Sequence, residues 1–534
     1  MSAPSPRLGR RQIGGLAAGA LVAGALPAWA QKADANTLVS SVQLPANLDP
    51  HQIFDVPMQA MMFNAYDNLY RYQNDPPEIV PWLAESHTAS ADGLVWEFKL
   101  RPGIKFHDGS EMTAEDVVYS FRRVLALGLG PAGAFLKILK PDNVTAPAKL
   151  LARFKLETSY APFFAAIPSV CIVNPRVIKP NEKDGDWGKT WLASNGAGSG
   201  AYKIVPAGYR PLEFLDMDVF DDHFLGWKHN PKPVRKIAVR PIKETSTRLL
   251  ALLNGSIDWT DTNIPADQVE EINKSKIAYT QKDVVMRTFV IRMNNTKPPC
   301  DNVNARRACA HAFNYMSFIN DILGGYATRD PYPQPETLWG LPKDAKGYDY
   351  DLKKAKEYAA KAAAEGAPMK RTFEIHVQSE NEQSVQGAQL FQSDLAQIGI
   401  NLKVVGSIWS NLVSAATKPE TTPDMWVHWV STYFVDPENW VGQMYDSQFH
   451  GTWKASAYYK NAEVDTLLRK ARGLVKQEER APLYQAAIRQ IMADSPDIWI
   501  YNSMQLQGIN KRVKGRRFCT VGQGLEVRTI SLDG

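Results

Sequence analysis

The sequence has 534 residues, with 61 Lys and Arg, 56 Asp and Glu, and a formal net charge of +5 at pH 7. Because its basic residues are dispersed through a near-neutral chain, there is no electrostatic case for a nucleic-acid partner. At roughly 100–200 residues per domain, this length predicts two to four domains with a large hydrophobic core.

The first 30 residues have the pattern of an export signal. Basic residues including Arg10 and Arg11 precede an Ala- and Gly-rich apolar run from Ile13 to Leu26, and Ala28-Trp29-Ala30 matches a small-x-small cleavage site. The run is shorter than the roughly 20 residues that a membrane-spanning helix needs. We expect residues 1–30 to be removed near Ala30. Arg10-Arg11 resembles an imperfect twin-arginine motif, so twin-arginine and general secretion both stay open.

The cysteines give no metal-binding or redox motif. They form no CxxC pair and no metal-ligand spacing, and they lie at Cys171, Cys300, Cys309 and Cys519. Export would permit disulfides, but free cysteine is strongly prone to burial. We expect four buried or free thiols.

The first half of the mature chain opens with a predicted strand at 37–42 and a helix from about 57 to 69. Residues 94–124 then predict strand-like runs at 95–100 and 104–106, a turn and a helix. Thr113 and Asp116 have the spacing of a capping box at the start of that helix. The sequence GLGPAG, beginning at Gly128, formally matches GxGxxG, but it follows a helix and contains a proline, so we expect a surface loop rather than a phosphate site.

The remaining elements alternate in the manner of an α/β fold. Helices are expected at 245–253, 303–313, 385–398 and 481–492. Strands are expected at 237–240, 286–293, 373–377, 400–404, 424–430 and 497–501. The segment 373–404 predicts one right-handed βαβ unit.

Motifs for catalysis are missing from the sequence. HExxH, Walker A and GxSxG do not occur, and the nine histidines are scattered. His223 and His229 stand in a polar loop and are expected to be solvated. We therefore expect no catalytic residue, no metal and no cofactor. An exported hydrolase without a recognisable motif stays an alternative, because catalytic triads are assembled in space rather than in sequence.

Several segments resemble those of the family 5 solute-binding proteins of bacterial ABC importers, the dipeptide, oligopeptide and nickel group. The main match is LVWEFKLRPGIKFHDGSEMTAEDVVYSFRRV at 94–124. Further matches are the entry segment from LDP at 48–50 to PWLAES at 81–86, NGAGSGAY at 195–202, and the run from Asn294 through the helix at 303–313, where Cys300 replaces the usual phenylalanine. The resemblance covers nearly all of residues 36–525.

The resemblance implies an α/β fold of the periplasmic-binding-protein type II kind, with two lobes, a hinge and a subdomain inserted in the first lobe. We expect the hinge at Met293–Thr296. We expect the signal peptide at 1–30 and the first lobe in three parts, at 36–75, 198–292 and, with the C-terminal tail, 498–534. The inserted subdomain is expected at 76–197 and the second lobe at 293–497.

The function implied is that of the periplasmic solute-binding component of an ABC importer. Hinge closure would capture a small polar solute between the lobes and deliver it to permease subunits in the inner membrane. A monomer without enzymatic activity is expected. A dedicated di- or oligopeptide carrier is the alternative within this class.

The ligand region is expected within 426–440, WVHWVSTYFVDPENW. In peptide-binding members, an aspartate in the matching stretch pairs with the ammonium group of the ligand. Here Ser431, Thr432 or Tyr433 stands at that place, with Thr432 the best match, and none is charged. A desolvated ammonium without a counter-charge is costly, so we expect another polar solute unless Asp436 reaches inward.

Aromatic side chains in a cleft wall could pack on apolar or sugar faces of a ligand or stack on a cation. Each could instead belong to the core. The candidate ligand-binding residues are Trp409, Trp429, Thr432, Tyr433 and Trp440, with His376 and His51 as weaker polar candidates.

Overall fold

The structure is a computed structural model that describes residues 34–53, 56–261, 264–379, 381–521 and 526–533. The expected signal peptide at 1–30 lies outside the described residues. Within the described ranges, no helix is both long and apolar enough to cross a membrane.

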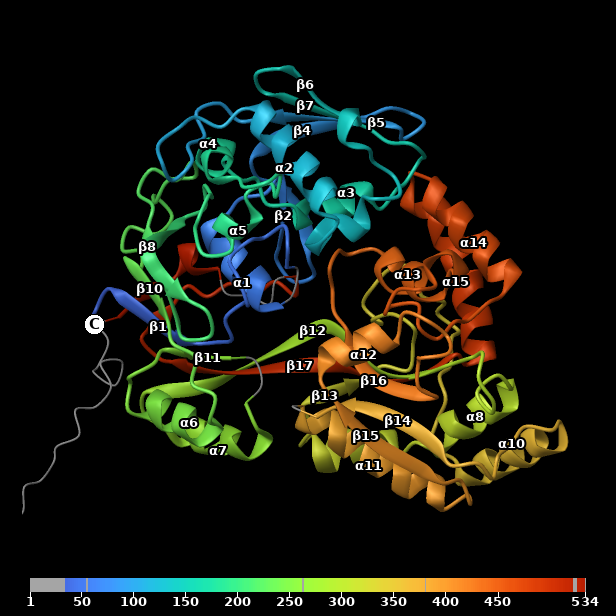
Figure 1. Ribbon diagram of the computed structural model, residues 1–534. Coiled ribbons are helices and arrows are strands. Elements are labelled where there is room, and N and C mark those ends of the chain that lie inside the picture. The colour runs from blue at the N-terminus through green and yellow to red at the C-terminus, as the bar shows by residue number, and fades with distance from the viewer. Residues whose placement is uncertain (1–33, 54–55, 262–263, 380, 522–525, 534) are drawn as a thin grey trace, which may run out of the picture.

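One mixed sheet of eleven strands runs through both lobes (Figure 1). Its order is β15-β14-β16-β12-β17-β11-β1-β10-β9-β8, and β13 pairs with β17 beside this path. The strands are β1 (Thr37–Ser41), β8 (Tyr202–Arg210), β9 (Phe214–Val219), β10 (Lys236–Val239), β11 (Trp259–Thr260), β12 (Ala278–Met293), β13 (Ala327–Arg329), β14 (Phe373–Gln378), β15 (Leu402–Ser407), β16 (Met425–Val430) and β17 (Asp497–Asn510).

The long antiparallel strands β12 and β17 connect the two lobes, and Figure 1 shows them crossing from one to the other. Their pairing is interrupted midway, because Val284 pairs with Met504 whereas Thr288 pairs with Asn502. Residues 285–287 therefore form a bulge in β12. From Thr288 onward, β12 also pairs with β16, so the bulge lies where β12 enters the second lobe.

The first lobe contains the β1, β8, β9, β10 and β11 end of the sheet. In it β1 pairs in parallel with β10 and β11. Its helices and short strands are α1 (Val56–Ala65), α6 (Thr245–Leu253), α7 (Ala266–Lys274), β2 (Tyr70–Gln73), β3 (Glu78–Pro81), β18 (Val513–Lys514) and β19 (Ser531–Leu532). The strand expected at 37–42 is confirmed, and the helix expected at 57–69 ends earlier, at Ala65.

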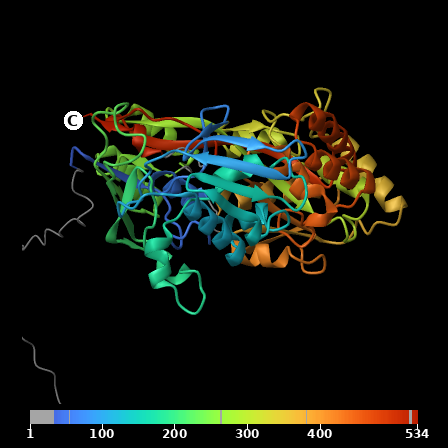
Figure 2. The ribbon, with the colours of Figure 1, turned by 90° about the horizontal axis from the view of Figure 1, so that it is seen from above.

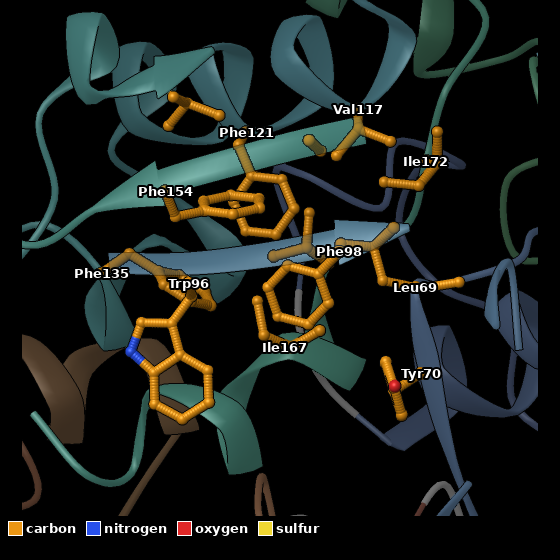
Figure 3. Close-up of a cluster of buried hydrophobic side chains, with 14 of the residues drawn as sticks. Leu69, Tyr70, Trp96, Phe98, Val117, Phe121, Phe135, Phe154, Ile167 and Ile172 are labelled. Carbon is orange, nitrogen blue, oxygen red and sulfur yellow. The ribbon is translucent and has the colours of Figure 1, made fainter. Parts of the chain in front are cut away.

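The inserted subdomain has its own antiparallel sheet in the order β4-β5-β7-β6. Its elements are β4 (Ala84–Ala89), β5 (Val95–Leu100), β6 (Val144–Ala148), β7 (Leu151–Lys155), α2 (Ala114–Leu127), α3 (Phe163–Ala166), α4 (Pro175–Ile178) and α5 (Lys189–Leu192). The predicted capping box is present at the start of α2, where the Asp116 carboxylate accepts from the Thr113 amide at 2.7 Å. The rings of Phe98, Phe121 and Phe154 meet in the core between sheet and helix (Figure 3).

The second lobe is the β14, β15 and β16 end of the large sheet with the helices around it. The predicted βαβ unit is confirmed as β14-α11-β15 with parallel strands. The helices are α8 (Val303–Ala312), α9 (Tyr315–Ser317), α10 (Leu352–Ala364), α11 (Glu382–Ala396), α12 (Trp409–Ala415), α13 (Val441–Tyr445), α14 (Ala462–Gly473) and α15 (Gln477–Asp494). Seen from above in Figure 2, the sheet of the inserted subdomain lies over the middle of the molecule, and in Figure 1 it lies at the top, with α14 below it on the right.

Two local predictions were wrong and two were confirmed. The GLGPAG segment lies at the surface as expected, with Leu129 47% exposed, and its second half forms a short 3-10 helix at Gly130–Ala134. The run expected as a strand at 104–106 forms only an isolated bridge from Lys105 to Glu111. His223 is buried rather than solvated, with Nε2 3.5 Å from the Asp67 carboxylate. The four cysteines are free thiols, as expected, and only Cys519 is partly exposed.

Candidate functional site

A small pocket lies between the lobes and is lined from both sides. Tyr433, three residues beyond β16, lines it from the second lobe. The other side is supplied by the first lobe, the inserted subdomain and the C-terminal segment, through Met62, Phe63, Asn68, Tyr72, Pro168, Ser169 and Val521. A neighbouring small pocket shares Phe63, Tyr72 and Val521 with it. A solute in these pockets would touch both lobes.

The lobes are in contact beside this pocket. Phe434 belongs to the second lobe, yet it is only 3% exposed and packs in the hydrophobic core of the inserted subdomain. The Tyr72 hydroxyl accepts from the Val435 amide at 2.9 Å and donates to the Ala165 carbonyl at 2.7 Å. The structure therefore has its lobes closed on one another.

Two further hydrogen bonds join the inserted subdomain to the end of α14. The Ala161 amide donates to the Arg472 carbonyl at 2.9 Å, and the Ser159 hydroxyl donates to the Gly473 carbonyl at 2.9 Å. Lys137 Nζ reaches the Gln448 carbonyl at 3.1 Å. These contacts join surfaces that are about 300 residues apart in sequence.

Three of the predicted ligand-binding residues lie together at the end of β16. Trp429 is 8% exposed, and its Nε1 donates to the Tyr501 hydroxyl at 3.2 Å. Thr432 is buried, and its hydroxyl donates to the main-chain carbonyl of Met286. Of the three, Tyr433 lines the pocket. Their role as ligand contacts stays a prediction.

The other predicted residues lie apart from this group. Trp409 begins α12 and packs against Trp426 and Trp453, with ring centroids 5.9 and 5.5 Å away. His376 lies on β14, partly buried and 3.7 Å from the Glu374 carboxylate. Two candidates are completely enclosed in the protein interior, namely Trp440 and His51.

His51 has an evident structural role. Its Nε2 lies 2.8 Å from the Cys171 carbonyl. Burial, together with the positive charge of nearby Arg123, lowers the pKa of His51 to about 4. The imidazole is therefore neutral at physiological pH and holds two distant segments of the first lobe and the inserted subdomain together.

Asp436 does not point toward the pocket. It caps the turn that follows it, accepting from the Glu438 amide at 2.9 Å, and it forms a two-bond ion pair with Arg480 at 2.7 and 2.8 Å. Glu438 is likewise buried and pairs with Arg472 at 2.9 Å. Both acids that follow the aromatic segment are thus already neutralised by arginines.

Cations near the pocket were not singled out from the sequence. Lys454 is buried, and its Nζ donates to Gln443 Oε1 at 2.6 Å and to Asn439 Oδ1 at 3.1 Å. The same ammonium lies 4.6 Å from the ring centroid of Tyr433. Burial lowers the pKa of Lys454 to about 7. No local pattern distinguishes this lysine, because the groups around it come from a turn and a short helix more than ten residues earlier.

Arg71 lines the neighbouring pocket and was also missed. It is buried between the rings of Phe63 and Trp82, 5.0 and 4.3 Å from their centroids. Its charge is balanced by Asp67 at 3.7 Å and Glu526 at 3.6 Å. Glu526 lies 455 positions away in the numbering, so no sequence spacing could reveal this contact.

Comparison with known proteins agrees with this architecture. The family model described as "Bacterial extracellular solute-binding proteins, family 5 Middle" matches residues 78–451. The "Probable D,D-dipeptide-binding periplasmic protein DdpA" of Escherichia coli K12 is 30% identical over 478 residues, covering 88% of this chain and 89% of that protein. "Heme-binding protein A" of Haemophilus influenzae is 26% identical, covering 91% and 90%.

A solved structure extends the similarity to the fold. The ABC transporter-associated periplasmic binding protein DppA from Helicobacter pylori, in complex with the peptide STSA, has a TM-score of 0.80 and 27% identity, covering 93% of this chain and 98% of that one. The two-lobed fold of the periplasmic-binding-protein type II kind is thereby confirmed, as is the resemblance found in the sequence. The chain belongs to family 5 of the bacterial extracellular solute-binding proteins, the binding components of ABC importers.

Proposed function

We propose that this protein captures a small polar solute between its lobes in the periplasm and delivers it, unaltered, to the inner-membrane permease of an ABC importer. The observation that carries this proposal is a pocket lined by Tyr433 on one lobe and by Tyr72 and its neighbours on the other. Such a pocket exists only when the lobes are together, so binding and closure are coupled. The protein acts as a monomer, without a cofactor and without catalysis.

The hinge of this proposal lies at the β12 bulge, residues 285–287, rather than at Met293–Thr296. Met293 pairs with Met425 within the second-lobe part of the sheet, which supports its moving with that lobe. The bulge interrupts the ladder between β12 and β17 where they pass between the lobes. A missing stretch of ladder hydrogen bonds is a place where two long strands can flex.

A free ammonium group is not a necessary feature of the solute. Thr432, which stands where peptide-binding members carry an aspartate, is uncharged and is hydrogen-bonded to Met286. Asp436 and Glu438 are held by arginines. Among the described residues that line the pocket, no acid is left to pair with an ammonium.

A dedicated di- or oligopeptide carrier is the second candidate. It is favoured by the relatives, since one is described as binding D,D-dipeptides and another was solved with a bound peptide. A peptide held by its carboxylate and its main chain would be compatible with the arrangement around Thr432.

A thermal-shift titration of the mature protein against a panel of solutes tests the proposal. A binder is stabilised by RT ln(1 + [L]/Kd), which is about 2.7 kcal/mol at a ligand concentration of 100 Kd. Mass spectrometry of the ligand recovered after binding should return the compound that was added. Conversion of that compound into a product would overturn the transport role in favour of an exported hydrolase.

A further inference from the structure

Side chains from three other parts of the chain form hydrogen bonds with the main chain of the β12 bulge. The Met286 amide donates to the Thr520 hydroxyl at 2.7 Å, and the Arg287 amide donates to Asn502 Oδ1 at 2.9 Å. The Met286 carbonyl accepts from the Thr432 hydroxyl. These side chains replace the partners that a regular ladder would provide, and a bulge of this kind redirects the side chains that it carries.

The side chain redirected here is Arg287. It is partly buried, and its guanidinium carbon lies 4.8 Å from the ring centroid of Trp429. Its Nε is enclosed and has no hydrogen-bond partner, and the guanidinium makes no hydrogen bond or ion pair among the described residues. Burial lowers the pKa of Arg287, whereas the nearby hydroxyls of Tyr433 and Tyr501 raise it.

The more deeply buried arginines of the described chain are all provided with acceptors. Arg306 donates to the main-chain carbonyls of Cys300 and Asp494, at 2.9 and 2.7 Å. Carboxylates pair with Arg71, Arg123, Arg248, Arg292, Arg472, Arg480 and Arg528. Because an enclosed cation without a partner is unfavourable, Arg287 stands out as a group that lacks its counterpart.

The surroundings of Arg287 also favour an anion. Tyr433, which lines the pocket, is flanked by Arg287 and by the buried ammonium of Lys454, 4.6 Å from its ring. The acids next in the sequence, Asp436 and Glu438, are neutralised by Arg480 and Arg472 and offer no compensating charge. Tyr433 is the residue that lines the pocket from the second lobe, and the two cationic side chains lie beside it rather than in the pocket lining.

We propose that Arg287 anchors a carboxylate of the transported solute, so that this protein selects carboxylate-bearing solutes. This inference rests on the proposed solute-binding function. A guanidinium can give two parallel hydrogen bonds to one carboxylate, and the enclosed Trp429 face fixes its plane. The solute thus supplies the acceptor that the chain itself does not.

The test uses the mature protein and matched pairs of probes that differ only at the carboxylate. The pairs are Ala-Ala and Ala-Ala carboxamide, N-acetyl-Ala-Ala and its carboxamide, succinate and succinamide, and gluconate and glucose. Thermal shift identifies binders and calorimetry gives their Kd. The peptide pairs and the organic-acid pairs distinguish the two sources of a carboxylate. We expect binding only from carboxylate members, in one of these two groups.

The variant Arg287→Gln should weaken the Kd of the bound carboxylate by about tenfold or more, since charge-assisted bonds to a carboxylate are lost. Arg287→Lys keeps the charge but cannot give two parallel hydrogen bonds to one carboxylate, so its Kd should lie between those of the wild type and Arg287→Gln. Without solute, Arg287→Gln should not lower the melting temperature, because removing an enclosed cation without a partner offsets the loss of its packing on Trp429.

The matched control is Arg329→Gln. Arg329 is also partly buried and lacks a carboxylate, but it donates to the carbonyls of Trp499, Ile500 and Tyr348. This variant should melt earlier and still distinguish carboxylate from carboxamide. The proposal is overturned if Arg287→Gln melts as early as the control and keeps the discrimination, or if only neutral members bind. If only neutral members bind, the proposed solute-binding function still holds and only the role of Arg287 is wrong. If no member of the panel binds, both the solute-binding function and the role of Arg287 are contradicted.

Discussion

Phe434 provides a direct test of whether closure of the lobes is coupled to binding. It follows the pocket residue Tyr433 in the second lobe, but its ring is enclosed in the core of the inserted subdomain. If the lobes separate in the absence of solute, this ring must leave that core. The substitution Phe434→Ala should therefore act on the closed state and leave the individual lobes intact.

The size of the effect follows from the burial of the ring. Full burial of a phenylalanine side chain is worth about 1.5–3 kcal/mol relative to exposure. A loss of about 2 kcal/mol from the closed state alone should weaken the Kd of a bound solute about 30-fold, because each 1.4 kcal/mol is a factor of ten. The melting temperature of the solute-free protein should change little.

Calorimetry on a solute found by the panel measures the Kd, and small-angle scattering measures the radius of gyration with and without it. We expect the Phe434→Ala protein to require a higher solute concentration than the wild type before its radius of gyration falls to the value of the closed form. The control is Phe154→Ala in the same core, where Phe154 packs on Phe121 with ring centroids 4.7 Å apart, both within the inserted subdomain. That variant should lose about 3–5 kcal/mol of stability with or without solute.

The reasoning is refuted if Phe434→Ala melts as early as Phe154→Ala while its Kd is unchanged. Phe434 would then belong to a core that never opens.

Three other substitutions test the closed contact and the buried charges. Tyr72→Phe leaves the Val435 amide without its acceptor, and we expect about 1–3 kcal/mol less stabilisation of the closed state, seen as a 5- to 150-fold weaker Kd; an unchanged Kd would contradict this. Burial raises the pKa of Asp330 to about 8, so the folded state holds its proton to higher pH than the unfolded state, and its contribution to stability is lost as pH rises from about 4 to about 8. In urea unfolding, the free energy of unfolding of Asp330→Asn should therefore rise relative to that of the wild type as pH increases from 5 to 8. A difference between the two proteins that stays constant over this range would contradict the prediction. Arg123→Met leaves Asp49 buried without its partner, and we expect a loss of about 3–5 kcal/mol in the same assay; a gain in stability would show that the pair is replaceable by apolar packing.

Much of the local structure could be predicted because it depends on neighbours in sequence. The alternation in β5, the capping box at Thr113 and the β14-α11-β15 unit each follow from short-range periodicity or hydrogen bonding. The extent of β12 could not be predicted, because its first half is stabilised by pairing with β17, whose residues are more than 200 positions away.

The candidate site was predictable in part for the same reason. Tyr433, at the predicted aromatic strand end, lines the pocket, but sequence alone does not distinguish a cleft wall from a core, since both are rich in aromatic residues. Trp440 was predicted to contact the ligand but lies fully in the core. His223 was predicted to be solvated but is buried against Asp67, a residue 156 positions earlier. Arg287 stands in an ordinary strand pattern, and only the bulge makes it distinctive.

The interrupted ladder has a consequence for how occupancy is communicated to the membrane. Because β12 and β17 pair where the sheet passes from one lobe to the other, a change of angle between the lobes would be accommodated as twist of these two strands. With the hinge proposed above, this twist would be greatest at the bulge beside Arg287, where ladder hydrogen bonds are missing. A solute held at this point would stiffen the most compliant part of the ribbon, so that loaded and empty molecules would differ in rigidity as well as in shape.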